Sequence, residues 1–234
     1  MKSCALFDID GTLLRGFIIQ SFPRYLADRC IIESRYSDEI DSIMGRYNAN
    51  LISYREAASA IPQLIAESIR GRGEEEVRRH ARDFMGEHIP RTLLSYAGDL
   101  IDSVKGRVEL AVALSGSPIE AVRALHGLGF DFECGTSFEI INGVYTGKVE
   151  ANLILGEVKA EHAVKIAENH GVDLRRTVAF GDSDQDAQTL ELVGLPIALN
   201  PNRAMMEICE ERGWRWYNEE TIDVEEIVDL VKQL

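Results

Sequence analysis

The feature of this sequence that most constrains its fold is a set of short apolar runs, each of which ends at a polar motif. These runs are residues 3–7, 108–114, 177–180 and 195–199. Runs of this length and composition are typical of buried parallel strands. Segments with helical periodicity separate them, and the expected helices are 118–128, 157–170, 185–193, 202–212 and 224–234. Such alternation predicts an α/β fold with a doubly wound, mostly parallel sheet.

Residues 15–88 interrupt this alternation. They contain long amphipathic stretches, of which Ser53 to Ile69 is one example, and no clear strand. The pattern predicts a helical insert of residues 15–88 between the first and second core strands, with the core formed by residues 1–14 and 89–234. Two further elements are expected in that core: an edge strand at 130–134 and a hairpin whose turn is Asn142-Gly143.

The excess of acidic residues limits the classes of molecule that this protein can bind. The chain has 39 acidic and 25 basic residues, a formal net charge of -14, which repels nucleic acids and anionic membrane surfaces. A phosphate site in such a chain needs local positive charge from a metal ion, a lysine or helix N-termini. No apolar stretch approaches the ~20 residues of a membrane span, and no basic-then-apolar leader is visible. We expect a cytoplasmic protein whose four widely spaced cysteines are free thiols.

The first polar motif is Asp8-Ile9-Asp10-Gly11-Thr12, directly after a predicted strand. Two aspartates two positions apart point the same way while the chain stays extended, so one can attack phosphorus while the other handles a proton. Gly11 lets the backbone turn close to a phosphate, and the amides of Gly11 and Thr12 can point at its oxygens. The alternative is an ordinary acidic turn, but the position after a buried strand favours the functional interpretation.

The second and third motifs are Ser115-Gly116-Ser117 and Lys159. Ser115 can bind a phosphate through its hydroxyl, helped by helix N-terminal amides, or both serines can only cap the next helix. We interpret Ser117 as that cap, within the capping box Ser117-Pro118-Ile119-Glu120. Lys159 opposes the dipole near the start of a helix, which suggests an anionic partner. Lys148 and Lys165 are nearby competitors.

The fourth motif, Gly181-Asp182-Ser183-Asp184-Gln185-Asp186, places three carboxylates between a strand and a helix. A calcium loop is excluded, because Ala187 replaces the required glycine and Val193 the terminal glutamate. A carboxylate loop with few dedicated ligands suits Mg²⁺, which keeps several waters. Asp184 we interpret as a plain N-terminal cap. The five histidines show no ligand spacing, so zinc is not supported.

In this order, the four motifs resemble the haloacid dehalogenase superfamily of phosphatases. The resemblance covers residues 1–14 and 89–234, and the helical insert is similar to the cap of the phosphoserine phosphatase-like branch. It implies that Asp8 is the nucleophile and forms an aspartyl-phosphate, while Asp10 protonates the leaving alkoxide and then activates water.

The same resemblance implies how a small phosphorylated metabolite and Mg²⁺ would be bound. Ser115 and Lys159 would hold the phosphoryl oxygens, with Gly11, Thr12 and Gly116 contributing to substrate binding. The implied Mg²⁺ ligands are Asp8, the backbone carbonyl of Asp10, and Asp182. Asp186 would orient these ligands without contacting the ion.

One departure concerns the substrate. Phosphoserine phosphatases use a glutamate soon after the nucleophile to receive the amino group, whereas residues 13–20 contain no carboxylate and Phe17 stands near that position. In the acidic loop, Gln185 stands where the phosphoserine phosphatase-like branch often has asparagine. These differences favour a phosphomonoester that is less polar or differently charged than phosphoserine. A phosphotransferase to an alcohol acceptor and a non-enzymatic, receiver-like phospho-accepting module are the alternatives; the sequence leaves the oligomeric state open.

Overall fold

The computed structural model describes all residues, 1–234, and its core is one seven-stranded sheet. The strands are β1 (Lys2–Phe7), β2 (Leu110–Pro118), β3 (Phe132–Ile141), β4 (Val144–Ala151), β5 (Val172–Gly181), β6 (Leu195–Leu199) and β7 (Arg215–Tyr217). Their order is β4-β3-β2-β1-β5-β6-β7, and every neighbouring pair is parallel except β3–β4. The predicted α/β fold with a mostly parallel sheet is confirmed.

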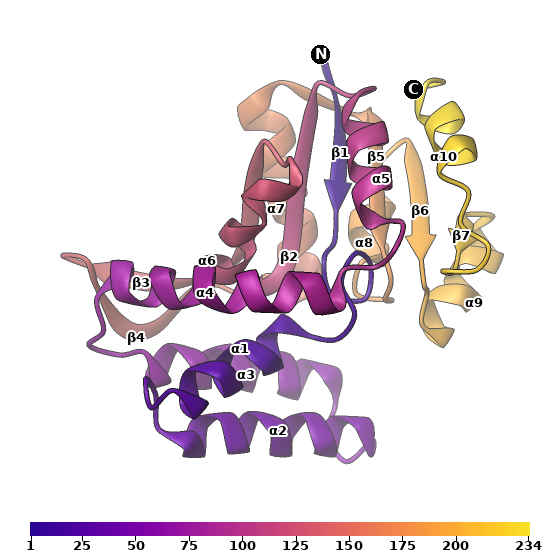
Figure 1. Ribbon diagram of the computed structural model, residues 1–234. Coiled ribbons are helices and arrows are strands. Elements are labelled where there is room, and N and C mark those ends of the chain that lie inside the picture. Colours follow the sequence, from indigo (N-terminus) through magenta and orange to yellow (C-terminus); the bar gives the residue numbers. More distant parts are fainter.

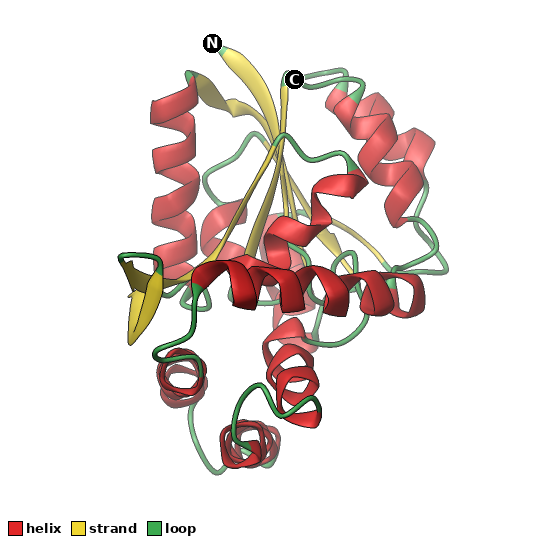
Figure 2. Cartoon of the chain, turned by 60° about the vertical axis from the view of Figure 1, so that its left-hand side comes forward, coloured by secondary structure: helices red, strands yellow, loops and turns green.

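Helices cover both faces of the sheet (Figures 1 and 2). They are α5 (Ala97–Lys105), α6 (Ile119–Val122) and α10 (Val224–Val231) on one face, and α7 (Gly156–His170), α8 (Ala187–Leu190) and α9 (Arg203–Arg212) on the other. The alternation of side chains in β1 explains this arrangement: Ala5 and Phe7 pack into the first hydrophobic cluster, Cys4 and Leu6 into the second. A strand buried on both faces reads as a continuous apolar run.

The helical insert follows β1, as expected, and reaches as far as β2. Besides α5, its helices are α1 (Ile18–Asp28), α2 (Ser34–Asn48), α3 (Tyr54–Ser68) and α4 (Glu74–Thr92). Figure 1 shows α1, α2 and α3 grouped beyond the carboxyl ends of the strands, with α4 crossing between them and the sheet. The expected domain boundary at residue 88 falls inside α4, and the division at that residue stays a prediction.

The strand expected at the edge of the sheet is not at the edge. β3 pairs with β2 on one side and with β4 on the other, so β4 is the outer strand. The connection is the predicted hairpin, in which Asn142 and Gly143 both adopt positive φ angles of 53° and 77°. The edge-strand prediction was wrong because this hairpin adds a strand outside β3.

The predicted capping box is also wrong. β2 continues through Ser115, Gly116 and Ser117 to Pro118, and Pro118 is the N-cap of α6, without a side-chain cap. β3 extends the strand, since the Thr136 hydroxyl donates to the Gly116 carbonyl at 2.6 Å. Glu120 is buried and accepts a hydrogen bond from the Tyr145 hydroxyl at 2.7 Å. Only one turn of α-helix forms before the 3₁₀ helix Arg123–Leu128.

Two smaller predictions concern the cysteines and the membrane. All four cysteines are free. Cys4 and Cys209 are buried, as expected for thiols that act as small apolar side chains, whereas Cys134 is half-buried and Cys30 is exposed. No helix combines the length and the apolar character that crossing a bilayer requires. The cytoplasmic location expected from the sequence stays a prediction.

Candidate active site

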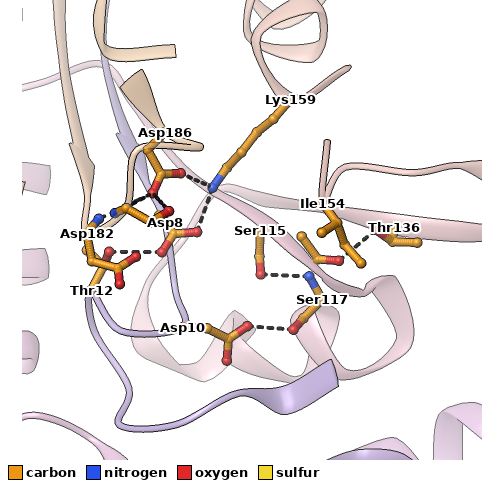
Figure 3. A network of polar contacts seen from close by, with 12 residues as sticks. Asp8, Asp10, Thr12, Ser115, Ser117, Thr136, Ile154, Lys159, Asp182 and Asp186 are labelled. Carbon is orange, nitrogen blue, oxygen red and sulfur yellow. Dashed lines mark hydrogen bonds and ion pairs between the residues drawn. The ribbon is translucent and has the colours of Figure 1, made fainter. Parts of the chain in front are cut away.

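The carboxyl ends of β1, β2 and β5 meet the first turn of α7 and bring the four motifs together (Figure 3). Ligands of open parallel sheets lie at this edge. The predicted residues gather there in buried or half-buried positions: Asp8, Asp10, Gly11, Thr12, Ser115, Gly116, Lys159, Asp182 and Asp186. Lysines are rarely buried unless paired, so Lys159, only 5% exposed, stands out from its competitors Lys148 and Lys165, which are exposed.

Asp8 is fixed at both carboxylate oxygens. Its Oδ1 accepts a hydrogen bond from Lys159 Nζ at 2.6 Å, and its Oδ2 accepts one from the Thr12 hydroxyl at 2.9 Å. Its backbone N–H donates to the Phe180 carbonyl at 3.0 Å, which ties the residue to β5. These hydrogen bonds fix the orientation of the Asp8 carboxylate, so a ligand at the sheet edge can approach it from one direction.

Asp186 is the second carboxylate that binds Lys159. Its Oδ1 accepts from Lys159 Nζ at 2.6 Å. Its Oδ2 accepts from the Asp182 and Ser183 amides at 3.3 and 3.1 Å, and from the Ser183 hydroxyl at 3.0 Å. Both oxygens of Asp186 are therefore engaged in holding Lys159 and the acidic loop in place.

The electrostatics of Asp8, Asp182, Asp186 and Lys159 favour binding of a cation. Burial raises the pKa of Asp8 to about 7; Lys159 opposes the shift, and the Asp186 and Asp10 charges add to it. Burial and the same neighbouring carboxylates, Asp8 and Asp186, raise the pKa of Asp182 well above its ordinary value. Burial lowers the pKa of Lys159, but Asp186 and Asp8 outweigh it, so the net direction is upward and the amine stays charged.

Carboxylate oxygens of Asp8, Asp182 and Asp186 lie within 4.8 Å of one another. When ionised, these three groups and the Lys159 ammonium sum to two negative charges, which one divalent cation would neutralise. Oxygen ligands of this kind suit a hard cation such as Mg²⁺. Asp182 is the freest of the three, because both oxygens of Asp8 and of Asp186 already accept hydrogen bonds, whereas the Asp182 carboxylate accepts none.

Gly11 contributes by its shape. Its φ is +84°, and a Cβ at this position would lie 2.2 Å from Asp182 Oδ2, so no other residue fits beside the acidic loop. Its N–H donates to the Leu14 carbonyl at 2.8 Å and is not free to point at a phosphate. The N–H of Thr12 makes no backbone hydrogen bond, and the residue is fully buried.

Asp10 lies apart from this group and turns toward β2 (Figure 3). Its Oδ1 accepts from the Ile18 N–H at 2.9 Å, and its Oδ2 accepts from the Ser117 hydroxyl at 2.5 Å. Burial raises its pKa, while the hydrogen bonds from Ser117 and Ile18 oppose that shift. Because Ile18 begins α1, the Asp10 carboxylate is held jointly by the core and the cap.

Ser117 is the functional residue that the sequence interpretation missed. The sequence interpretation made it a helix cap. In the structure Ser117 belongs to β2, and its hydroxyl donates to the Asp10 carboxylate. Its N–H donates to Ser115 Oγ at 3.0 Å, and Ser115 is fully buried. The signal that could have found it is the two-residue spacing of the serines, which places both on one face of a strand.

The N-cap interpretation of Asp184 is wrong. α8 begins only at Ala187. The Asp184 carboxylate accepts hydrogen bonds from the side-chain amides of Asn202 at 3.1 Å and Gln185 at 2.8 Å. The expected helix 185–193 shrinks to one turn because the loop winds around the Asp186 carboxylate before the helix starts.

Known proteins resemble this chain in sequence and in fold. Phosphoserine phosphatase SerB1 of Mycobacterium tuberculosis is 27% identical over 222 residues, which cover 92% of this chain and 70% of that protein. A protein of unknown function from Bordetella pertussis Tohama I has a similar structure, with a TM-score of 0.77, 24% identity and coverage of 96% of this chain and 100% of that one.

A substrate-bound phosphoserine phosphatase also shares the fold, with a TM-score of 0.66, 24% identity and 98% coverage of both chains. The model of the haloacid dehalogenase-like hydrolase family matches residues 5–191, which contain Asp8, Ser115, Lys159 and Asp182. This match extends over most of the chain and includes each of the four motifs. The protein therefore belongs to the haloacid dehalogenase-like hydrolases.

Proposed function

We propose that the protein is a Mg²⁺-dependent phosphatase that hydrolyses a small phosphomonoester through an aspartyl-phosphate on Asp8. The observation that carries the proposal is the orientation of Asp8 between Lys159 and Thr12, beside the carboxylate of Asp182. The match to the hydrolase family and the 27% identical relative named as a phosphoserine phosphatase support it.

In the first step, an oxygen of Asp8 forms a bond to phosphorus as the bond from phosphorus to the substrate alcohol breaks. The phosphoryl oxygens are bound by the Ser115 hydroxyl, the Lys159 ammonium and the Thr12 N–H, and Gly116 lines the same cavity. These groups stabilise negative charge where it develops. Mg²⁺, held by Asp8, the Asp10 carbonyl and Asp182, would supply further charge neutralisation.

Asp10 is the proton-transfer group in this proposal. Its carboxyl group faces the cavity and is not paired to Lys159, and its raised pKa favours the protonated form that a general acid needs. It gives its proton to the leaving alkoxide. In the second step it accepts a proton from the water that attacks the aspartyl-phosphate, which releases inorganic phosphate and restores Asp8.

The alternatives predict different fates for the phosphorylated enzyme. A phosphotransferase would pass the phosphoryl group to an alcohol, and a receiver-like module would keep it for a long time. A second carboxylate held beside the site and a cavity between the cap and the core favour rapid chemistry on a bound small molecule.

The direct test measures phosphate release from p-nitrophenyl phosphate with Mg²⁺ and with excess EDTA, together with the lifetime of the phosphorylated protein. We expect turnover only with Mg²⁺ and a phosphoprotein that decays in less than a second. A phosphoprotein that lasts for hours would support the receiver-like alternative. Transfer of phosphate to glycerol, in preference to water, would support the phosphotransferase.

Ser117→Ala tests the role of Asp10. The change removes one of the two donors to the Asp10 carboxylate, so we expect kcat to fall about 10- to 100-fold with little change in KM, a part of the usual effect of a general acid–base group. Ser37→Ala is the matched control, a buried serine of α2 that donates only to the Ser34 carbonyl. An increase in KM at unchanged kcat would contradict a positioning role for Ser117.

A further inference from the structure

The cavity above Asp8 lies between the cap and the sheet edge. Its volume is about 260 Å³, just below the range of roughly 300–1,000 Å³ that is usual for ligand pockets. The Tyr54 hydroxyl donates to the Ile154 carbonyl at 2.6 Å, and the Asn152 side chain donates to the Ala58 carbonyl at 2.8 Å. These bonds hold α3 against the core, so the cavity has a definite shape.

The wall that the cap contributes carries no charge. It consists of Phe17 and Ile19 from the start of α1, Met44 and Tyr47 of α2, and Tyr54, Ile61 and two alanines of α3. Its only polar side-chain atoms are the two tyrosine hydroxyls. That of Tyr54 is already bonded to Ile154, and that of Tyr47 makes no hydrogen bond within the protein.

The wall that the core contributes is acidic. It holds five aspartates and a single cation, Lys159, whose ammonium group is bound to Asp8 and Asp186. A carboxylate on the leaving group would find no positive partner in this cavity, and an unpaired buried charge is costly. An ammonium group would find no acid in the cap. The two cavity carboxylates outside the metal cluster already accept hydrogen bonds: Asp10 from Ile18 and Ser117, and Asp184 from Asn202 and Gln185.

We infer that the substrate is a phosphomonoester of an uncharged, mainly apolar alcohol, whose carbon skeleton packs against Phe17, Met44 and Tyr47 of the cap. The Tyr47 hydroxyl offers one neutral hydrogen bond to it. Tyr47 and Tyr54 meet edge to face, with ring centroids 5.9 Å apart, and so present a rigid surface. This inference rests on the proposed phosphatase function and names its substrate class.

The test compares kcat/KM for hexyl phosphate, phosphoserine, phosphoethanolamine and 3-phosphoglycerate with Mg²⁺. Serine is chemically the better leaving alcohol, because its ammonium group withdraws electrons, so a preference for hexyl phosphate would come from the pocket. We expect hexyl phosphate to exceed each charged substrate by at least about tenfold, as an apolar pocket discriminates against groups it cannot pair.

Phe17→Glu adds a charge at this wall. Phe17 is 51% exposed, so the substitution should not disturb folding. We expect kcat/KM for hexyl phosphate to fall about tenfold or more, and its ratio to phosphoethanolamine to fall further. The matched control is Leu51→Glu, which adds the same charge to the same cap at a residue that is 71% exposed and outside the cavity. It should leave both values unchanged.

The outcomes separate the two proposals. Faster turnover of phosphoserine, phosphoethanolamine or 3-phosphoglycerate than of hexyl phosphate would overturn the substrate class and leave the phosphatase function standing. An unchanged preference in the Phe17→Glu protein would overturn the role of this wall. If no phosphomonoester, p-nitrophenyl phosphate included, is hydrolysed with Mg²⁺, the proposed function fails and the inference falls with it.

Discussion

Asp8→Asn is expected to reduce turnover of p-nitrophenyl phosphate by about 10⁴-fold or more, the scale of loss when an essential nucleophile is removed. An amide cannot form the phosphoryl ester that the two-step reaction requires. The reason lies in the geometry: within the acidic cluster, Asp8 is the carboxylate bonded to both Lys159 and Thr12. Steady-state kinetics and acid-stable phosphate labelling of the protein measure the effect.

The same variant should remain folded. Burial and neighbouring carboxylates raise the pKa of Asp8 to about 7, above the ordinary value of 3.8. A carboxyl group whose pKa is raised on folding costs stability as pH rises through that interval, so at pH 8 without Mg²⁺ the neutral asparagine should not lower Tm. Asp28→Asn, an exposed change at the end of α1, is the control with full activity. Wild-type turnover by Asp8→Asn would remove the nucleophile from the proposed mechanism.

Asp182→Asn is expected to abolish the response to Mg²⁺. In the wild-type protein, Mg²⁺ at 100 times its dissociation constant should stabilise the fold by about 2.7 kcal/mol, seen as an increase in Tm. The variant loses a carboxylate of the cluster that includes Asp8 and Asp186. We expect no Tm increase over the same titration, and a loss of turnover of about 10³-fold, matching the several kcal/mol that a bound metal ion contributes.

Asp184→Asn is the matched control for this experiment. Asp184 is in the same loop, but its carboxylate bonds to Asn202 and Gln185 and is not part of the cluster. This variant should keep the Tm increase with Mg²⁺. A Mg²⁺ response in Asp182→Asn equal to that of Asp184→Asn would show that the ion binds elsewhere.

Much of the architecture was predictable because it depends on local chemistry. A short apolar run that ends at Asp8 is typical of a buried strand with a carboxylate at its end, and the Asn142-Gly143 pair specifies a tight turn. The three wrong helix-start predictions share one cause. Ser117, Asp184 and Glu120 each have a residue type that favours a helix start, but each is bonded to a partner outside its own segment.

The sequence alone thus determined the α/β order, the helical insert after the first strand and the residue types that end each strand, because neighbours in the chain set these properties. Only the tertiary structure decided which side chains meet: Lys159 reaches Asp8 across 151 residues and Ser117 reaches Asp10 across 107. It also decided that the cap covers the site with an uncharged wall. Contacts at such separations depend on how sheet and cap pack together, which no local pattern encodes.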